Sequence, residues 1–121
     1  KMTIAFDLDD VLCFRDPEAK GKVDKYKTCY PNTNMIEVAN RCKQEGYRII
    51  IYTARGMTGF NGDISKIYSN LYELTKSQLK DWGVNYDQLI MGKAHYDLLI
   101  DDKAINSLLI NSKKDVEQCL N

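Results

Sequence analysis

The sequence predicts an α/β fold with a mainly parallel sheet. Short β-rich runs alternate with segments of helical spacing, and the longer gaps between runs have room for a crossover helix. The run at residues 48–52 is continuously apolar after its first residue, as in strands that are buried on both faces of a parallel sheet. We therefore expect the element order β-α-β-α-β-β-α with right-handed crossovers.

The first predicted strand covers residues 3–6 and ends in the acidic string Asp7-Leu8-Asp9-Asp10. A polar stretch at residues 13–34 follows, rich in charges and turn formers, and we interpret it as an irregular flap. A helix is predicted next, because apolar residues recur at i, i+3, i+4 and i+7, namely Met35, Val38, Ala39 and Cys42.

The second long strand, residues 48–52, leads into a loop with Thr53, Ala54, Arg55 and Gly56. Asp63 is placed to cap a long helix that runs to about Trp82, and Gly83 ends it.

Two further strands are predicted at residues 88–91 and 97–100, the second ending in Asp101 and Asp102. One or two short helices complete the chain. In open α/β sheets, functional sites lie beyond the carboxyl ends of the strands, and every residue of chemical interest here follows such an end.

Composition indicates one domain over residues 1–121, with seventeen Lys and Arg balancing seventeen Asp and Glu. The zero formal charge argues against a nucleic-acid coat or a polybasic membrane surface. No apolar run is long enough to span a bilayer and no signal peptide is recognisable, so a cytoplasmic protein without a membrane partner is expected. Its four widely spaced cysteines are expected to be separate reduced thiols.

The acidic residues at the strand ends predict a metal site. Asp7 and Asp9 follow the first strand, and Asp101 and Asp102 follow the last. Carboxylates that converge in this way repel one another unless a cation lies among them, and hard oxygen ligands suit Mg²⁺.

The other strand ends carry groups that, taken as a set, suit phosphate. The Thr53 hydroxyl and the backbone N–H groups after it are placed to hold phosphate oxygens. Lys93, just after a short strand, would neutralise phosphate charge. Arg55, two residues after Thr53, is expected to contact the part of a bound phosphorylated ligand beyond its phosphate.

These motifs resemble the haloacid dehalogenase-like phosphatase superfamily. Phe6-Asp7-Leu8-Asp9-Asp10-Val11-Leu12 resembles its first motif and Ile51-Tyr52-Thr53 its second, while Lys93 fits the third and Leu98-Leu99-Ile100-Asp101-Asp102 the fourth. The four occur in the family's order over nearly the whole chain. The resemblance implies a single three-layer Rossmann-like core. The insertion points lack the length of a large cap domain, so only a short flap is expected.

The resemblance also implies a mechanism. Asp7 would attack phosphorus to form an aspartyl-phosphate, and Asp9 would serve as general acid and then as base. Thr53, Ala54, Arg55 and Lys93 would bind the phosphorylated substrate, with Thr53 and Lys93 also catalytic. Mg²⁺ would be held by Asp7, by the backbone carbonyl of Asp9, and by Asp101 or Asp102.

A narrower resemblance points to a substrate class. Residues 52–56 and 92–104 are similar to small phosphatases linked to bacterial capsule-polysaccharide biosynthesis, although Ala94 stands where those relatives have proline. This implies a small sugar or polyol phosphate as substrate. An open site also admits a nucleotide or a polynucleotide end, although the neutral charge disfavours nucleic acid. A homodimer that closes the site is compatible with the sequence.

Two readings from other classes stay open. A receiver-type signalling domain also has acidic residues after its first strand, with Thr and Lys at later strand ends. Its phospho-accepting Asp, however, ends the third strand, whereas here the Asp-Asp pair ends the last. A phosphate-binding module without catalysis is the third reading. The substrate, the oligomeric state, the direct metal ligand among Asp101 and Asp102, and the roles of the flap and His95 do not follow from the sequence.

Overall fold

A parallel three-stranded sheet forms the centre of the protein in the computed structural model, which describes residues 2–120. The strands are β1 (Thr3–Phe6), β4 (Arg48–Thr53) and β5 (Gln88–Met91), in the order β1-β4-β5. Phe6 pairs with Ile51, and Thr53 pairs with Met91. The predicted α/β class, the parallel sheet and these three strands are confirmed.

Two long helices connect the strands, as the apolar periodicity predicts. Helix α2 (Thr33–Gln44) precedes β4, and α3 (Ile64–Asp81) lies between β4 and β5. The side chain of Asn32 accepts a hydrogen bond from the backbone of Met35 at the start of α2, and Asp63 caps α3 in the same way through Lys66. No helix among residues 2–120 is both long and apolar enough to cross a membrane.

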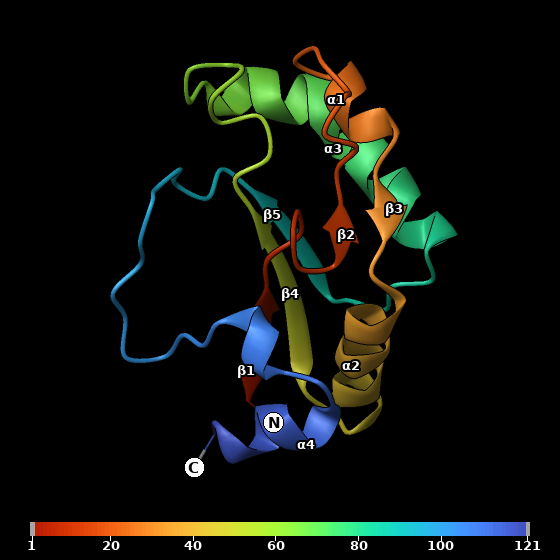
Figure 1. Ribbon diagram of the computed structural model, residues 1–121, viewed down its shortest axis with the longest axis vertical. Helices are drawn as coiled ribbons and strands as arrows, with labels where there is room; N and C mark the ends of the chain where they lie inside the picture. Colours follow the sequence, from red (N-terminus) through yellow and green to blue (C-terminus); the bar gives the residue numbers. More distant parts are fainter. Residues whose placement is uncertain (1, 121) are drawn as a thin grey trace.

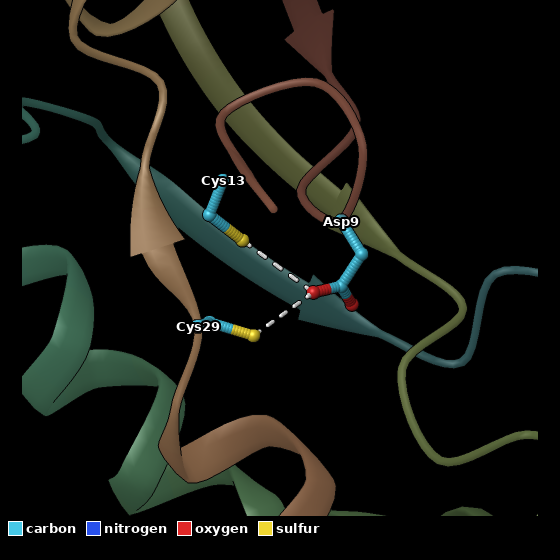
Figure 2. Close-up of side chains that lie close together, drawn as sticks. All are labelled: Asp9, Cys13 and Cys29. Atoms are coloured by element: carbon cyan, nitrogen blue, oxygen red, sulfur yellow. Dashed lines mark hydrogen bonds between the residues drawn. The ribbon is translucent and has the colours of Figure 1, made fainter. Parts of the chain in front are cut away.

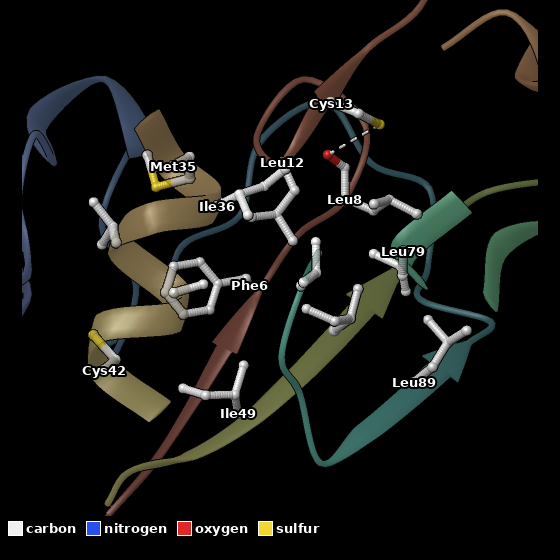
Figure 3. Packing of buried hydrophobic residues seen from close by; sticks show 14 of the residues in the cluster. Phe6, Leu8, Leu12, Cys13, Met35, Ile36, Cys42, Ile49, Leu79 and Leu89 are labelled. Atoms are coloured by element: carbon white, nitrogen blue, oxygen red, sulfur yellow. Dashed lines mark hydrogen bonds between the residues drawn. The ribbon is translucent and has the colours of Figure 1, made fainter. Parts of the chain in front are cut away.

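One face of the sheet packs against these helices to form the hydrophobic core (Figure 3). Ile49 and Ile51 of β4 and Leu89 of β5 point into it together with Phe6 of β1. Leu8 and Leu12, from the turn after β1, fill the space above the sheet and are fully buried. The core therefore fixes the turn that carries the Asp7 and Asp9 motif.

The opposite face of the sheet is poorly covered. Ala5 and Tyr52 are exposed there, and Ile50 and Ile90 are half-buried. Within residues 2–120 this face lacks the helical layer that a three-layer core requires, so the three-layer expectation is not met by the described chain.

The flap at residues 13–34 is more regular than its composition predicts. Strands β2 (Cys13–Phe14) and β3 (Tyr30–Pro31) pair antiparallel, and the short helix α1 (Asp24–Lys27) lies between them. Tyr26 of α1 is buried, and its carbonyl accepts a hydrogen bond from the Gln78 side chain of α3. The flap is thus a hairpin anchored to the core.

Residues 97–100 contradict the predicted fourth strand. They form no strand, and Leu98 and Ile100 are 76% and 90% exposed. Figure 1 shows the chain leaving the end of β5 in a wide arc, in blue, away from the sheet. It returns through the 3-10 turn η1 (Ser107–Leu109) to helix α4 (Lys113–Gln118), which packs on α2.

Candidate functional site

Asp7 and Lys93 meet at the carboxyl end of the sheet, as predicted. The Lys93 Nζ lies 3.5 Å from Asp7 Oδ2, and the Lys93 backbone N–H donates to the Thr53 carbonyl at 3.0 Å. Asp7 Oδ1 accepts a hydrogen bond from the backbone of Leu8. β1, β4 and the segment after β5 therefore bring these groups to one point.

The ammonium of Lys93 is held charged by its surroundings. Burial alone would lower its pKa, but hydrogen bonding to Tyr96 and the nearby Asp7 carboxylate raise the pKa above the ordinary lysine value. The rings of Tyr52 and Tyr96 lie 5.8 and 5.4 Å from Nζ, within cation–π range. A fixed positive charge thus stands beside the Asp7 carboxylate.

A tight turn after β1 orients Asp9. The Leu8 carbonyl accepts hydrogen bonds from the backbones of Val11, Leu12 and Cys13, which curls the chain around it. Asp10 takes a φ of 68°, in the left-handed region that Asp tolerates better than most residues. The Asp9 side chain consequently points back towards the loop after β4.

Arg55 pairs with Asp9 in a buried two-point contact. Its Nε donates to Asp9 Oδ2 at 3.1 Å and its Nη2 donates to Asp9 Oδ1 at 2.9 Å. Its Nη1 donates to Thr75 Oγ1 and Gln78 Oε1 of α3, and the guanidinium stacks 4.6 Å from the Tyr26 ring. Desolvation works against the charge of Arg55, but the Asp9 carboxylate outweighs it and raises the pKa of the guanidinium.

This contact corrects the substrate-contact role expected for Arg55. The residue is 2% exposed and its donors are directed to Asp9, Thr75 and Gln78. Its physical role is to position Asp9 and to join the flap to α3.

Two cysteines lie beside Asp9 (Figure 2), and Arg55 Nη2 also donates to their sulfurs at 3.7 and 3.8 Å. The Cys13 and Cys29 sulfurs lie 3.4 and 3.8 Å from Asp9 Oδ1, and they come from the two sides of the flap hairpin. The cysteines are free thiols, as expected, but these two are neighbours rather than separate. A hydrogen bond from Cys13 lowers the pKa of Cys29, whereas the same contact, together with burial, raises the pKa of Cys13.

A cavity of about 420 Å³ opens at this end of the sheet. Asp7, Asp9, Thr53 and Lys93 line it, and so do Ala54 and Arg55, so six of the predicted site residues meet there. Thr53 is nearly fully buried, and its Oγ1 accepts from the Arg55 backbone. Additional lining residues come from the flap and from the segment after β5, including Arg15, Lys25, His95 and Tyr96.

Asp101 and Asp102 do not line the cavity of their own chain. Both are exposed on the arc after β5, where the backbone N–H of Lys103 and the neighbouring Asp102 lower the pKa of Asp101. The carboxylates predicted to bind metal therefore fall into two separate groups.

The residues of one chain consequently do not fit a magnesium site. Across residues 2–120, the one close group of three side chains of metal-ligating type is Asp9, Cys13 and Cys29. Thiols are poor ligands for Mg²⁺, and Arg55 already occupies the Asp9 carboxylate. Asp7 and the Asp9 carbonyl supply too few oxygen ligands without Asp101 or Asp102.

Sequence reasoning missed the groups that surround Asp9. Thr75 and Gln78 are polar residues on the buried stripe of α3, and that position is the signal that could have indicated an interior polar network. Cys13, Cys29 and Tyr26 gave no signal, because the flap that carries them has no periodic pattern.

Comparison with known proteins finds likeness only in three dimensions. No family model matches the sequence, and no curated protein matches it. The fold is similar to the crystal structure of a structural-genomics target from Vibrio cholerae, with a TM-score of 0.78 and 25% identity over 99% of this chain and 98% of that one. A chain in the structure of a Pnkp1/Rnl/Hen1 complex matches with a TM-score of 0.55 and 24% identity, over 84% of this chain and 31% of that one. The second likeness shows the fold alone.

The two thiols beside Asp9 should react differently with an alkylating reagent. At neutral pH we expect iodoacetamide to modify Cys29 faster than Cys13 or Cys42, because the thiolate is the nucleophile and only Cys29 has a lowered pKa. Since the pKa is lowered, modification of Cys29 should persist below the ordinary cysteine value of about 8.5. Peptide mass spectrometry over a pH series measures each site.

Cys29→Ser is the matched control and should remove the fast reaction. Equal rates at Cys13 and Cys29, or a rate at Cys29 that rises only above the ordinary cysteine pKa, would contradict the hydrogen-bonded pair.

Proposed function

We propose that this protein is a haloacid dehalogenase-like phosphatase that hydrolyses a small phosphomonoester through an aspartyl-phosphate on Asp7. The observation that supports this most is the Asp7 carboxylate with Lys93 Nζ 3.5 Å away, at the mouth of a cavity lined by further cations. The four motifs in family order support the same family. The full-length likeness to the Vibrio cholerae structure supports a shared fold.

The cavity suits a phosphoryl group by charge and by geometry. Arg15, Lys25 and Lys93 line it beside Asp7 and Asp10, so positive groups are available to a phosphoryl dianion. Thr53 ends β4 and Ala54 follows it, and both residues line the same cavity. Charge that develops on the phosphoryl oxygens would be stabilised there by the fixed ammonium of Lys93.

The first chemical step is a displacement at phosphorus. An Asp7 carboxylate oxygen attacks, a bond forms between that oxygen and phosphorus, and the bond from phosphorus to the ester oxygen breaks. The departing alkoxide takes a proton from Asp9. Lys93 holds Asp7 in place and stays protonated through this step, as its raised pKa requires.

The second step releases phosphate with Asp9 as base. Asp9 accepts a proton from water, the water oxygen attacks phosphorus, and the bond to Asp7 breaks. Arg55 holds the Asp9 carboxyl group in position through its two hydrogen bonds.

Substrate class and cofactor follow from the family resemblance. We propose a sugar or polyol phosphate of surface-polysaccharide biosynthesis in the cytoplasm as substrate. Mg²⁺ is proposed as cofactor, held by Asp7 and the Asp9 carbonyl together with carboxylates that one chain does not bring to the cavity. An uncapped cavity also admits a nucleotide, so nucleotides belong among the substrates tested.

Replacement of the nucleophile should abolish turnover without loss of the fold. We expect Asp7→Asn to lower phosphate release at least about a thousandfold, because no carboxylate is left to form the intermediate. The assay measures phosphate release from sugar, polyol, amino-alcohol and nucleotide monophosphates, each with Mg²⁺ and with chelator.

The matched control is Asp24→Asn, which removes an exposed carboxylate paired only with Lys27 and should keep full activity. Circular dichroism checks that both variants fold. Turnover retained by a clean Asp7→Asn preparation would contradict the proposal.

The role of Asp9 predicts an effect that depends on the leaving group. For an alkyl phosphate, Asp9→Asn should lower kcat by about 10²- to 10⁴-fold, because the alkoxide leaves without its proton. Nitrophenolate departs without protonation, so with nitrophenyl phosphate the variant should release about one nitrophenol per site rapidly and then stall. Rapid-mixing absorbance measures this burst. If kcat falls equally for both substrates and no burst is seen, Asp9 has a structural role and does not transfer the proton.

A further inference from the structure

A short apolar segment of strand-like sequence is exposed on the arc after β5. Leu98, Leu99 and Ile100 are 76%, 47% and 90% exposed, although three consecutive apolar residues are ordinarily buried. Burial of such apolar side chains is favourable because it removes their surface from water. The segment at residues 97–100 therefore has a strong drive to pack against another surface.

The outer edge of β1 is a surface that such a segment fits. β1 is an edge strand of the sheet formed by residues 2–120, so one side of its backbone is open to a further strand. Its sequence Thr-Ile-Ala-Phe has no charge, proline or bulge of the kind that protects natural edge strands. Ala5 and Thr3 are exposed along it, as expected for a strand that lacks one neighbour.

The same chain cannot supply this strand in the parallel direction. The Lys93 backbone N–H is hydrogen-bonded to the Thr53 carbonyl. Because Phe6 pairs with Ile51, Thr53 lies two residues further along the strand direction than Phe6. If a strand at residues 97–100 paired with the outer edge of β1 so that Asp101 is level with Asp7, Asp97 would be level with Thr3. Measured from Thr53, Asp97 would then lie about 16 Å back along the strand direction and two strand spacings, about 10 Å, across the sheet. The straight distance is about 19 Å, whereas the four residues from Lys93 to Asp97 span at most about 14 Å.

We propose that two copies of this chain exchange residues 97–102, each adding a parallel strand to the outer edge of the other copy's β1. Each copy offers both the exposed segment and the open edge, so the contact is reciprocal and closes as a two-fold dimer. The arc in Figure 1 already carries the segment away from its own sheet.

The exchange would complete the catalytic site. It places Asp101 and Asp102 of the second copy at the carboxyl end of β1, next to Asp7, and supplies the oxygen ligands for Mg²⁺ that one chain lacks. This part rests on the proposed function, whereas the exchange of strands does not.

Cross-linking tests the exchange without any assay of activity. Strand register places Ala5 opposite Leu99, so Ala5→Cys and Leu99→Cys proteins, both in a Cys119→Ser background, are co-expressed with different tags. A short bismaleimide should join the two tagged chains, and peptide mass spectrometry should find the bridge between positions 5 and 99. Light scattering should give the mass of a dimer before cross-linking.

The matched control pairs Ala5→Cys with Leu108→Cys, which is as exposed as the segment but lies outside it, and should give no bridge. A double variant that carries Ala5→Cys and Leu99→Cys in one chain tests whether the segment pairs with β1 of its own chain. A bridge within one chain, or a protein that stays a monomer, would overturn the exchange in favour of the segment closing on its own β1.

Complementation tests whether the exchange completes the site. Asp7→Asn and the double variant Asp101→Asn/Asp102→Asn should each be inactive, yet co-expression should restore roughly a quarter of wild-type activity through mixed dimers with one intact site. Cross-linked dimers without restored activity would overturn the shared site. Wild-type dimers that bridge but hydrolyse no phosphomonoester would overturn the proposed function and leave the exchange standing.

Discussion

The buried pair of Arg55 and Asp9 holds together the end of the sheet at which the cavity opens. The guanidinium reaches the turn after β1 through Asp9, helix α3 through Thr75 and Gln78, and the flap through the Tyr26 ring. All of its donors find partners, and no buried polar side-chain atom among residues 2–120 is left unsatisfied. Loss of one partner of such a pair ordinarily costs about 3–5 kcal/mol, because an uncompensated charge remains buried.

This network explains why Asp7 and Asp9 differ although one residue separates them. Asp7 lies at the cavity with its side chain 39% exposed and a single ammonium beside it. Asp9 is more buried, at 18%, and is held on both oxygens. An exposed, lightly held carboxylate suits a nucleophile, and a fixed carboxylate suits proton transfer at one position. The environment, rather than the residue type, therefore separates the two proposed roles.

Local patterns in the sequence predicted most of the sheet and the core of the site. Strand and helix periodicity, with the Asp63 cap, located β1, β4, β5, α2 and α3. The convergence of Asp7, Thr53 and Lys93 followed from strand ends meeting at one edge. The surroundings of Asp9 could not be predicted, because they depend on contacts between α3, a loop and an aperiodic flap. Residues 97–100 have the composition of a buried strand, but no sequence pattern states which β-edge they pair with or in which copy.

Asp7 is proposed to accept the phosphoryl group, and the proposal is tested by trapping that group on the protein. The enzyme would be mixed with substrate, quenched in acid within the first turnover and digested, and the phosphorylated peptide would be identified by mass spectrometry. We expect a hydroxylamine-sensitive phosphoryl group on Asp7 that is absent without substrate. Turnover with the phosphoryl group on another residue, or with none trapped even in Asp9→Asn, would contradict it.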